Sequence, residues 1–204
     1  MHAIGAPVIA GLSRAIAEAE RNYKGLVIWA ADAADGGAFS AGADLQAMLP
    51  LFMSGGVKAI EPEVVRLQQC FQAMKYAGVP VVAAVAGLAL GGGCELTLHA
   101  ARRVAAIESY IGLVEVGVGL IPAGGGLKEA ALRAAADAKG NDLLQFLKHY
   151  FMNAATAAVS KSALEARQMG YLKADDVIVF NPYELLHVAK VEARAMFDAG
   201  YRPP

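Results

Sequence analysis

The chain has 204 residues, of which 56% are hydrophobic and 18% are charged, and its formal net charge is −1. This length suits one domain with a small helical appendage, and the apolar fraction indicates a large core or a buried oligomer face. The balanced charge argues against nucleic acid or an anionic membrane as the main partner. The only cysteines, Cys70 and Cys94, cannot build a disulfide framework, and with no signal peptide visible we expect a cytoplasmic protein.

The first part of the chain predicts helices and strands separated by clear breaks. Apolar residues at helical spacing indicate the helices, and a continuous apolar run indicates a strand buried on both faces. Turn residues, a glycine pair and prolines mark the breaks. In chain order we expect a helix over 8–22, a strand over 25–31, a turn over 32–37, a loop over 39–44, a short helix over 45–49 stopped by Pro50, and a helix from Pro62 to Tyr76.

The second part continues the alternation and then becomes mainly helical. In chain order we expect a strand over 80–85, a helix over 94–102, a strand over 103–107, a turn over 122–126 with a helix to about 136, and then mostly helix, with N-terminal caps at Ser162 and Asn181. Strands alternating with helices predict an α/β fold with mainly parallel pairing. We therefore predict a core over 1–136 and a helical C-terminal extension over 137–204.

One segment has the length of a membrane span, because residues 76–94 carry no charge. Pro80 and four glycines interrupt it, and Tyr76 to Gly78 has turn chemistry. A buried strand, a loop and the start of a helix explain the segment better, so we expect no membrane span.

Three clusters could carry chemistry. The first is the small-residue loop over 39–45, and the second is the glycine triplet over 91–93, which leads directly into Glu95. The third is the run over 112–122, in which Glu115 is the only charged residue. A glycine triplet alone is explained by a tight turn, since glycines cost backbone entropy and permit close approach. A lone carboxylate in an apolar run is either paired or functional.

The first two clusters can each direct one backbone N–H outward, and two such groups that meet at one carbonyl oxygen form an oxyanion hole. The carboxylates of Glu95 and Glu115 could then share acid–base work beside it. The alternative is structural, with either acid in a buried ion pair with Arg102, Arg103 or Lys128.

Other catalytic motifs do not fit. A nucleophile elbow around Ser40 would need glycine where Ala38 stands, and neither a P-loop nor a complete dinucleotide-binding fingerprint occurs. Glu95 and His99 have the spacing of a metal pair on a helix but no third ligand, so we expect no metal and interpret His99 as a packing residue. Cys94 has no evident base and is interpreted as a buried small residue.

Taken together, the clusters resemble the enoyl-CoA hydratase/isomerase, or crotonase, family. Its pattern is Phe-x-Ala-Gly-Ala-Asp-Leu/Ile, then Ala-Leu-Gly-Gly-Gly-Cys-Glu, then a glutamate about twenty residues later, here Glu115 after Glu95. The resemblance covers residues 1–136, and the segment over 159–170 is similar to a later helix of the family. The third cluster is most similar to the hydratase part of bacterial bifunctional proteins that also contain a 3-hydroxyacyl-CoA dehydrogenase part.

The resemblance implies a crotonase-like spiral of ββα units and assigns roles to residues. The N–H groups of Ala43 and Gly92 would form the oxyanion hole for the thioester oxygen. Glu95 would orient and activate the water that adds at C3, and Glu115 would deliver a proton to C2. The substrate would also contact Ser40, Ala41, Asp44, Leu45 and Gly91.

The implied activity is hydration of a trans-2-enoyl-CoA in fatty-acid β-oxidation, with no cofactor beyond the coenzyme A of the substrate. The family also implies a homo-oligomer, a trimer or a hexamer. Enoyl-CoA isomerase and acyl-CoA hydrolase remain alternatives on the same scaffold, as does an inactive acyl-CoA-binding fragment of a bifunctional 3-hydroxyacyl-CoA dehydrogenase. Two glutamates favour hydration, because isomerases of the family often use one carboxylate.

Two departures from the family pattern stand out. Ala123 follows Pro122 where the family usually has glycine, which would narrow the acyl pocket or alter the next turn. The family also begins with a β-hairpin, and we expect this hairpin to be missing before the opening residues of this chain. An unpaired sheet edge would follow, and we expect subunit contacts or lower stability to result.

Overall fold

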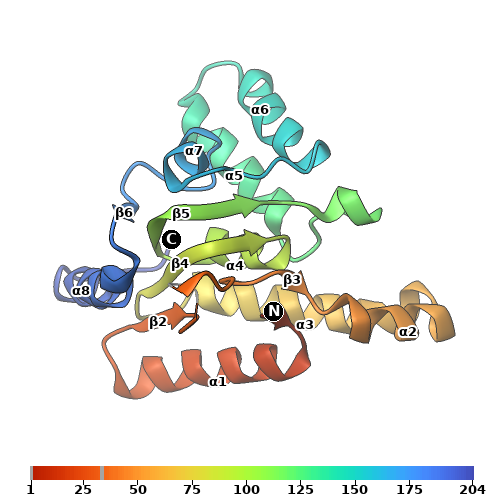
Figure 1. Ribbon diagram of the computed structural model, residues 1–204, viewed down its shortest axis with the longest axis horizontal. Helices are drawn as coiled ribbons and strands as arrows, with labels where there is room; N and C mark the ends of the chain where they lie inside the picture. Colours follow the sequence, from red (N-terminus) through yellow and green to blue (C-terminus); the bar gives the residue numbers. More distant parts are fainter. Residues whose placement is uncertain (1, 33–34) are drawn as a thin grey trace.

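The computed structural model describes residues 2–32 and 35–204 and has a parallel sheet at its centre (Figure 1). In spatial order the strands are β2 (Leu26–Trp29), β4 (Val81–Leu90), β5 (Arg102–Gly112) and β6 (Val177–Val179). A smaller parallel sheet pairs β1 (Ala3–Ile4) with β3 (Gly42–Ala43). The predicted α/β class with mainly parallel pairing is confirmed.

Helices surround this sheet, and α2 projects away from it in Figure 1. Their bounds are Ala6–Asn22 (α1), Leu45–Gly55 (α2), Val57–Lys75 (α3), Gly92–His99 (α4), Gly126–Ala138 (α5), Leu143–Ala155 (α6), Ala163–Gln168 (α7) and Leu185–Asp198 (α8), with short 3-10 helices at Glu115–Val118 (η2) and Pro182–Glu184 (η3). In the part of the chain that the structure describes, no helix combines the length and the apolarity needed to cross a bilayer.

The core lies on both faces of β4, because successive side chains of a strand point to opposite faces. Val81, Ala83 and Val85 belong to the cluster that also contains Phe71 and Met74 of α3. The alternate residues of the strand belong to a second cluster, together with Leu185, Ala189 and Ala193 of α8. The uncharged segment over 76–94 is therefore a buried strand flanked by a turn and a helix start.

Two prolines do not act as predicted. The short helix was expected to stop at Pro50, but α2 continues to Gly55, and α3 begins at Val57 rather than at Pro62. Both prolines lie inside exposed stretches of helix. Water can therefore satisfy the carbonyl group that loses its amide partner, and the helices tolerate the prolines.

Around the glycine triplet the predicted bounds are also wrong. β4 extends to Leu90 and β5 to Gly112, because the two strands keep pairing after a register shift. Gly91 has a φ of 53° and turns the chain, so that α4 begins at Gly92 and ends before β5. The predicted turn over 32–37 includes residues 33 and 34, which lie outside the described residues.

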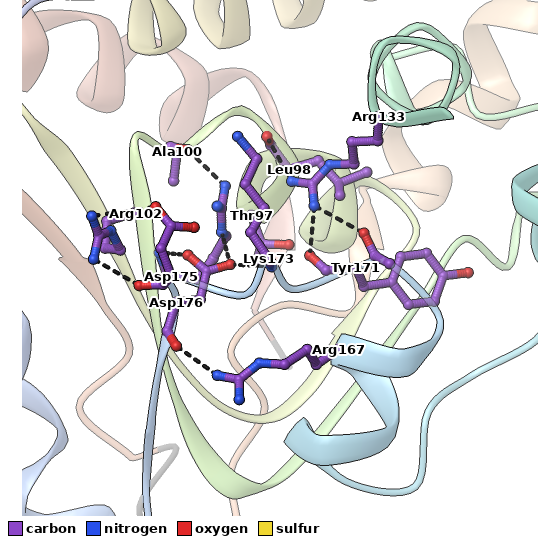
Figure 2. Close-up of polar contacts among 12 residues, drawn as sticks. Thr97, Leu98, Ala100, Arg102, Arg133, Arg167, Tyr171, Lys173, Asp175 and Asp176 are labelled. Atoms are coloured by element: carbon purple, nitrogen blue, oxygen red, sulfur yellow. Dashed lines mark hydrogen bonds and ion pairs between the residues drawn. The ribbon is translucent and has the colours of Figure 1, made fainter. Parts of the chain in front are cut away.

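The C-terminal residues are not all helical, since β6 joins the central sheet beside β5. Asp176, just before β6, accepts hydrogen bonds from the backbone N–H and the Nε of Arg103, at 2.9 and 2.7 Å. Arg133 of α5 donates to the carbonyl oxygens of Gly170 and Tyr171, at 2.9 and 3.3 Å (Figure 2). These contacts tie the C-terminal segment to the core sheet, while the predicted division at residue 136 stays a prediction.

Candidate active site

The first two sequence clusters lie against each other at the carboxyl end of β4. The Ser40 N–H donates to the Leu88 carbonyl oxygen and the Leu90 N–H donates to the Ser40 carbonyl oxygen, both at 2.9 Å. Gly42 then has a φ of 101°, and a Cβ at this position would lie 2.9 Å from the Leu90 carbonyl oxygen. Only glycine fits this turn, which brings the loop onto the glycine triplet.

This contact brings Ala43 and Gly92 together. A Cβ on Gly92 would lie 3.3 Å from the Ala43 nitrogen. The next amide, that of Asp44, donates to the Ile4 carbonyl oxygen of β1. Successive amides of a strand point to opposite sides, so the Ala43 N–H is directed away from β1. The Gly92 N–H begins α4 and has no partner within the helix, so both groups can serve one acceptor.

Glu95 lies in the first turn of α4 and is 2% exposed. Its Oε1 accepts a 2.8 Å hydrogen bond from the Gly126 N–H, at the start of α5. A Cβ on Gly124 would collide with the other carboxylate oxygen, so this glycine lets the loop before α5 close over the acid. Burial raises the pKa of Glu95 to about 7; the Gly126 hydrogen bond opposes the shift and the charge of Glu115 adds to it.

Glu115 begins the 3-10 helix η2, and both of its carboxylate oxygens are buried. Neither oxygen has a hydrogen-bond partner among the described residues. Burial raises the pKa of Glu115, against the nearby backbone amides of Glu115 and Val114, which lower it without reaching hydrogen-bond geometry. A buried carboxylate without a partner is costly, so its retention favours a chemical role over a structural one.

Both glutamates contact Gly91, Glu95 through its main chain and Glu115 through its carboxylate. The Glu95 N–H donates to the Gly91 carbonyl oxygen at 2.9 Å, and a Cβ on Gly91 would lie 3.3 Å from Glu115 Oε1. The absence of a side chain at this position lets the Glu115 carboxylate approach the turn that carries the Gly92 amide. The arrangement places two carboxylates of raised pKa beside two amides that can stabilise a developing oxyanion.

The residues predicted to contact substrate have different surroundings. The Ser40 Oγ donates to the His2 carbonyl oxygen and accepts from the Gly42 N–H, so it holds the loop. Asp44 caps α2 by accepting from the Ala47 N–H. The Gly91 N–H is also engaged, by the Gly112 carbonyl oxygen. Ala41 is half-buried and Leu45 is exposed. Their contacts with substrate stay predictions.

The structural alternative for the two acids is wrong, because each candidate cation pairs elsewhere. Arg102 contacts Asp175 and Glu192, and Arg103 pairs with Asp176. Lys128 contacts Glu129 and His99. Neither catalytic candidate takes part in an ion pair within residues 2–32 and 35–204.

His99 is more than a packing residue. Its ring lies 5.4 Å from that of Phe71, but its Nδ1 bonds to the main-chain oxygen of Glu95 at 2.7 Å and its Nε2 contacts Lys128. It does not face the Glu95 carboxylate as a metal pair would. The described ranges contain no cluster of three side chains able to hold a metal ion. The two cysteines, Cys70 and Cys94, are buried free thiols.

The sequence did not identify Gly126 as the residue that binds Glu95. The signal available was the glycine run 124–126 after Pro122, which indicated only a turn. Ala123, the departure from the family pattern, is exposed, and its carbonyl oxygen accepts from Gln68 Nε2 at 2.6 Å. Its methyl group therefore leaves the two acids untouched.

Comparison with known proteins agrees with this geometry. The model of the enoyl-CoA hydratase/isomerase family matches residues 1–172. A Bacillus subtilis (strain 168) protein named probable 3-hydroxyacyl-CoA dehydrogenase is 42% identical over 203 residues, which are 100% of this chain and 25% of that protein. A peroxisomal fatty acid β-oxidation multifunctional protein of Arabidopsis thaliana is 35% identical over 150 residues, 72% of this chain and 20% of its own length. The match thus spans only 25% and 20% of the lengths of these two curated relatives.

Solved structures show the same fold. The crystal structure of an enoyl-CoA hydratase from Polaromonas sp. JS666 has a TM-score of 0.75 at 24% identity, and the match covers 96% of this chain and 68% of that one. The predicted crotonase-like architecture is confirmed by this likeness and by the family match. The chain belongs to the enoyl-CoA hydratase/isomerase family.

Proposed function

We propose that this protein is an enoyl-CoA hydratase, which adds water to a trans-2-enoyl-CoA and gives a 3-hydroxyacyl-CoA. The observation that carries the proposal is a pair of buried carboxylates near the Ala43 and Gly92 amides: Glu115 lies against Gly91, and its charge is close enough to raise the pKa of Glu95 in the first turn of α4. The curated relatives are named for β-oxidation or for 3-hydroxyacyl-CoA dehydrogenation, which supports a role in fatty-acid oxidation.

The proposed mechanism gives each group the role that the family resemblance implies. The Ala43 and Gly92 amides hold the thioester oxygen and stabilise the negative charge that develops on it when C3 is attacked. Glu95 in its ionised form takes a proton from the water as the water oxygen bonds to C3. Glu115 in its protonated form gives its proton to C2. Water is thus added as hydroxyl and hydrogen, and the proton on Glu95 returns to Glu115 to complete the cycle.

The surroundings of the two acids suit these roles. The Gly126 N–H favours the ionised form of Glu95, since a hydrogen bond to a carboxylate stabilises its charge. Burial without a hydrogen-bond partner favours the neutral form of Glu115. Burial raises the pKa of both acids, and the hydrogen bond from Gly126 distinguishes Glu95 as the one better suited to accept a proton.

The test is the absorbance of crotonyl-CoA, whose conjugated enoyl thioester band disappears on hydration. We expect rapid loss of the band with the wild type and a loss slower by about 10²–10⁴-fold with Glu115→Gln. Gain of the band from a 3-enoyl-CoA would identify an isomerase, and release of the CoA thiol would identify a hydrolase. Binding of crotonyl-CoA without any of these changes would contradict the proposal and indicate an acyl-CoA-binding module.

We also propose that the enzyme works without a cofactor and in a reducing compartment. The reaction needs no metal or cofactor beyond the coenzyme A of the substrate, so a chelator such as EDTA is expected to leave the rate unchanged. Loss of the activity on chelation would contradict this. Buried free thiols at Cys70 and Cys94 support a reducing compartment such as the cytoplasm.

We also propose a homo-oligomer, a trimer or a hexamer. Several large apolar side chains are exposed, among them Leu49, Met53, Ile121 and Leu144, at 61–77%. Large apolar side chains left exposed in a single chain are often covered at subunit interfaces. Light scattering that gives the mass of a single chain would contradict the proposal.

A further inference from the structure

A buried cluster of charged side chains connects three helices next to the main chain of Glu95. Its centre is Glu129 of α5, which is 4% exposed. The two carboxylate oxygens of Glu129 accept from Lys75 Nζ of α3 at 2.7 and 2.9 Å, and Oε1 also contacts Lys128 Nζ at 2.8 Å. His99 Nε2 of α4 lies 3.5 Å from the same oxygen. One buried carboxylate therefore gathers groups from α3, α4 and α5.

The two hydrogen-bond partners of His99 determine which nitrogen of its imidazole carries the proton. Its Nδ1 faces a carbonyl oxygen, that of Glu95, so Nδ1 carries the proton. Its Nε2 then accepts from Lys128 Nζ at 3.0 Å. Burial lowers the pKa of His99 to about 4, which keeps the imidazole neutral near neutral pH. His99 thereby connects the main chain of α4 at Glu95 with the ammonium group on α5.

Glu129 and Gly126 share the first turn of α5. Gly126 donates its N–H to Glu95 Oε1, and three residues later Glu129 is fixed by cations. Gly125, the residue before Gly126, packs closely against His99, since a Cβ on Gly125 would lie 2.8 Å from His99 Cε1. The turn is thus held at two points, by a charge cluster on one side and by the catalytic carboxylate on the other.

We propose that Glu129 is a positioning residue of the active site, because it holds the first turn of α5, and with it the Gly126 amide, against the Glu95 carboxylate. The inference rests on the proposed function, in which an ionised Glu95 activates water. Burial alone would raise the pKa of Glu129, but the hydrogen bonds from Lys128 and Lys75 outweigh it and lower the pKa. Glu129 is therefore a fixed anion that keeps both ammonium groups in place.

The groups around Glu95 determine how its pKa would change if the first turn of α5 moved. Glu115 is the charged neighbour that disfavours ionisation, and the neighbouring Cys94 thiol is buried and neutral. The amides over 124–126 favour ionisation. Charged groups around Glu129 are Lys75, Lys128 and, one turn along α5, Arg133. If the turn moves, Glu95 loses hydrogen-bond support while the burial that raises its pKa remains.

The main experiment compares Glu129→Gln with Glu192→Gln. Glu192 is a half-buried glutamate whose partner, Arg102, lies away from the site, so it is a matched control for loss of a paired carboxylate. We expect Glu129→Gln to move the acidic limb of the kcat/KM profile upward by about half a pH unit or more. The shift lowers kcat/KM at pH 6 severalfold and leaves it nearly unchanged at pH 8.5. The control variant is expected to keep the wild-type limb.

A second measurement requires no substrate. In a 13C NMR titration of the Glu95 carboxyl group, Glu129→Gln should raise its midpoint and Glu192→Gln should not. An inactive wild type would overturn the proposed function and leave this titration able to judge Glu129. Loss of thermal stability in Glu129→Gln with an unmoved Glu95 midpoint would overturn the inference, since Glu129 would then act on folding alone.

If Glu129→Gln does not fold, Lys128→Met provides the test, because Lys128 is the more exposed partner, at 38%. Removing its charge leaves His99 facing Glu129, so the midpoint of the His99 imidazole should rise in an NMR titration. The rearranged turn should also raise the Glu95 midpoint. Unchanged midpoints for both residues would contradict the proposal.

Discussion

The two acids of the site are held in opposite ways. Glu95 lies in a helix of the core, is almost fully buried and accepts a hydrogen bond from Gly126. Glu115 lies on a 3-10 helix with exposed neighbours, Val116 at 45% and Val118 at 60%, and its carboxylate has no partner in the described part of the chain. One acid is fixed by the scaffold, and the other is placed on an open segment.

This difference fits the proposed division of work. An acid that aligns water must keep its position relative to the oxyanion hole, and α4 carries both Gly92 and Glu95 within one turn. An acid that delivers a proton must remain neutral, and the surroundings of Glu115 favour that state. A rigid base and a lightly held acid can thus arise from a single pair of glutamates.

The largest expected effect is on catalysis itself. Glu95→Gln and Glu115→Gln should each lower kcat with crotonyl-CoA by about 10²–10⁴-fold, because each removes one member of the acid–base pair. The pH profile of the residual activity should distinguish the two variants. Glu95→Gln should lose the acidic limb of the profile, and Glu115→Gln should lose the basic limb. Identical profiles would show that the two acids do not have distinct roles.

The second-largest expected effect is on how the free energy of unfolding changes with pH. The folded-state pKa of Glu95, about 7, is above its ordinary value of 4.5, so the folded protein binds this proton more tightly than the unfolded chain. Its contribution to stability is full below about pH 4.5 and is lost as the pH rises through 7, a change of up to about 3 kcal/mol. Urea unfolding at pH 5 and pH 8 should show a smaller difference in Glu95→Gln than in the wild type. An equal difference would contradict the raised pKa.

Alanine variants of Gly124, which lies against Glu95, and of Gly91, which lies against Glu115, compare how firmly the two acids are held. Gly124→Ala would force the Glu95 carboxylate from its position, and we expect a loss of kcat of about 10²-fold. Gly91→Ala meets Glu115 at 3.3 Å, where the open segment can yield, so its loss of kcat should be smaller. Because Gly91 has a φ of 53° and a ψ of −121°, a backbone conformation that residues with a side chain rarely adopt, its variant should lose about 1–3 kcal/mol of folding stability. A larger kcat loss in Gly91→Ala would reverse the comparison.

The smallest effect is expected at Ala123. Its side chain is exposed and its carbonyl oxygen alone contacts Gln68, so Ala123→Gly should change kcat/KM by less than about twofold and stability by about 0.5 kcal/mol or less. Steady-state kinetics and thermal unfolding measure both. A severalfold change would show that this position shapes the acyl pocket.

What the sequence could predict depended on local pattern. The glycine triplet, the small-residue loop and the spacing of Glu95 and Glu115 are short-range features, and the family resemblance that they carry implied the pairing of Ala43 with Gly92. The Gly126 hydrogen bond was beyond reach because it depends on how α5 packs on α4, which no local pattern encodes. Pro50 was misread because the exposure of its helix decides whether the proline is tolerated.

The C-terminal strand was missed for a related reason. Three apolar residues over 177–179 are too few to show a period, and their strand forms by pairing with β5, about seventy residues earlier. Likewise, the charge cluster around Glu129 joins α3, α4 and α5, so His99 had no visible partner in the sequence.

The position of α8 has a consequence for how this chain folds during synthesis. Leu185, Ala189 and Ala193 cover one face of the central sheet, whose strands β4 and β5 are complete by Gly112. On the ribosome that face stays uncovered until α8 has emerged, at least seventy residues later. At about 5–20 residues per second the delay is several seconds, during which a chaperone would find an apolar sheet face to hold.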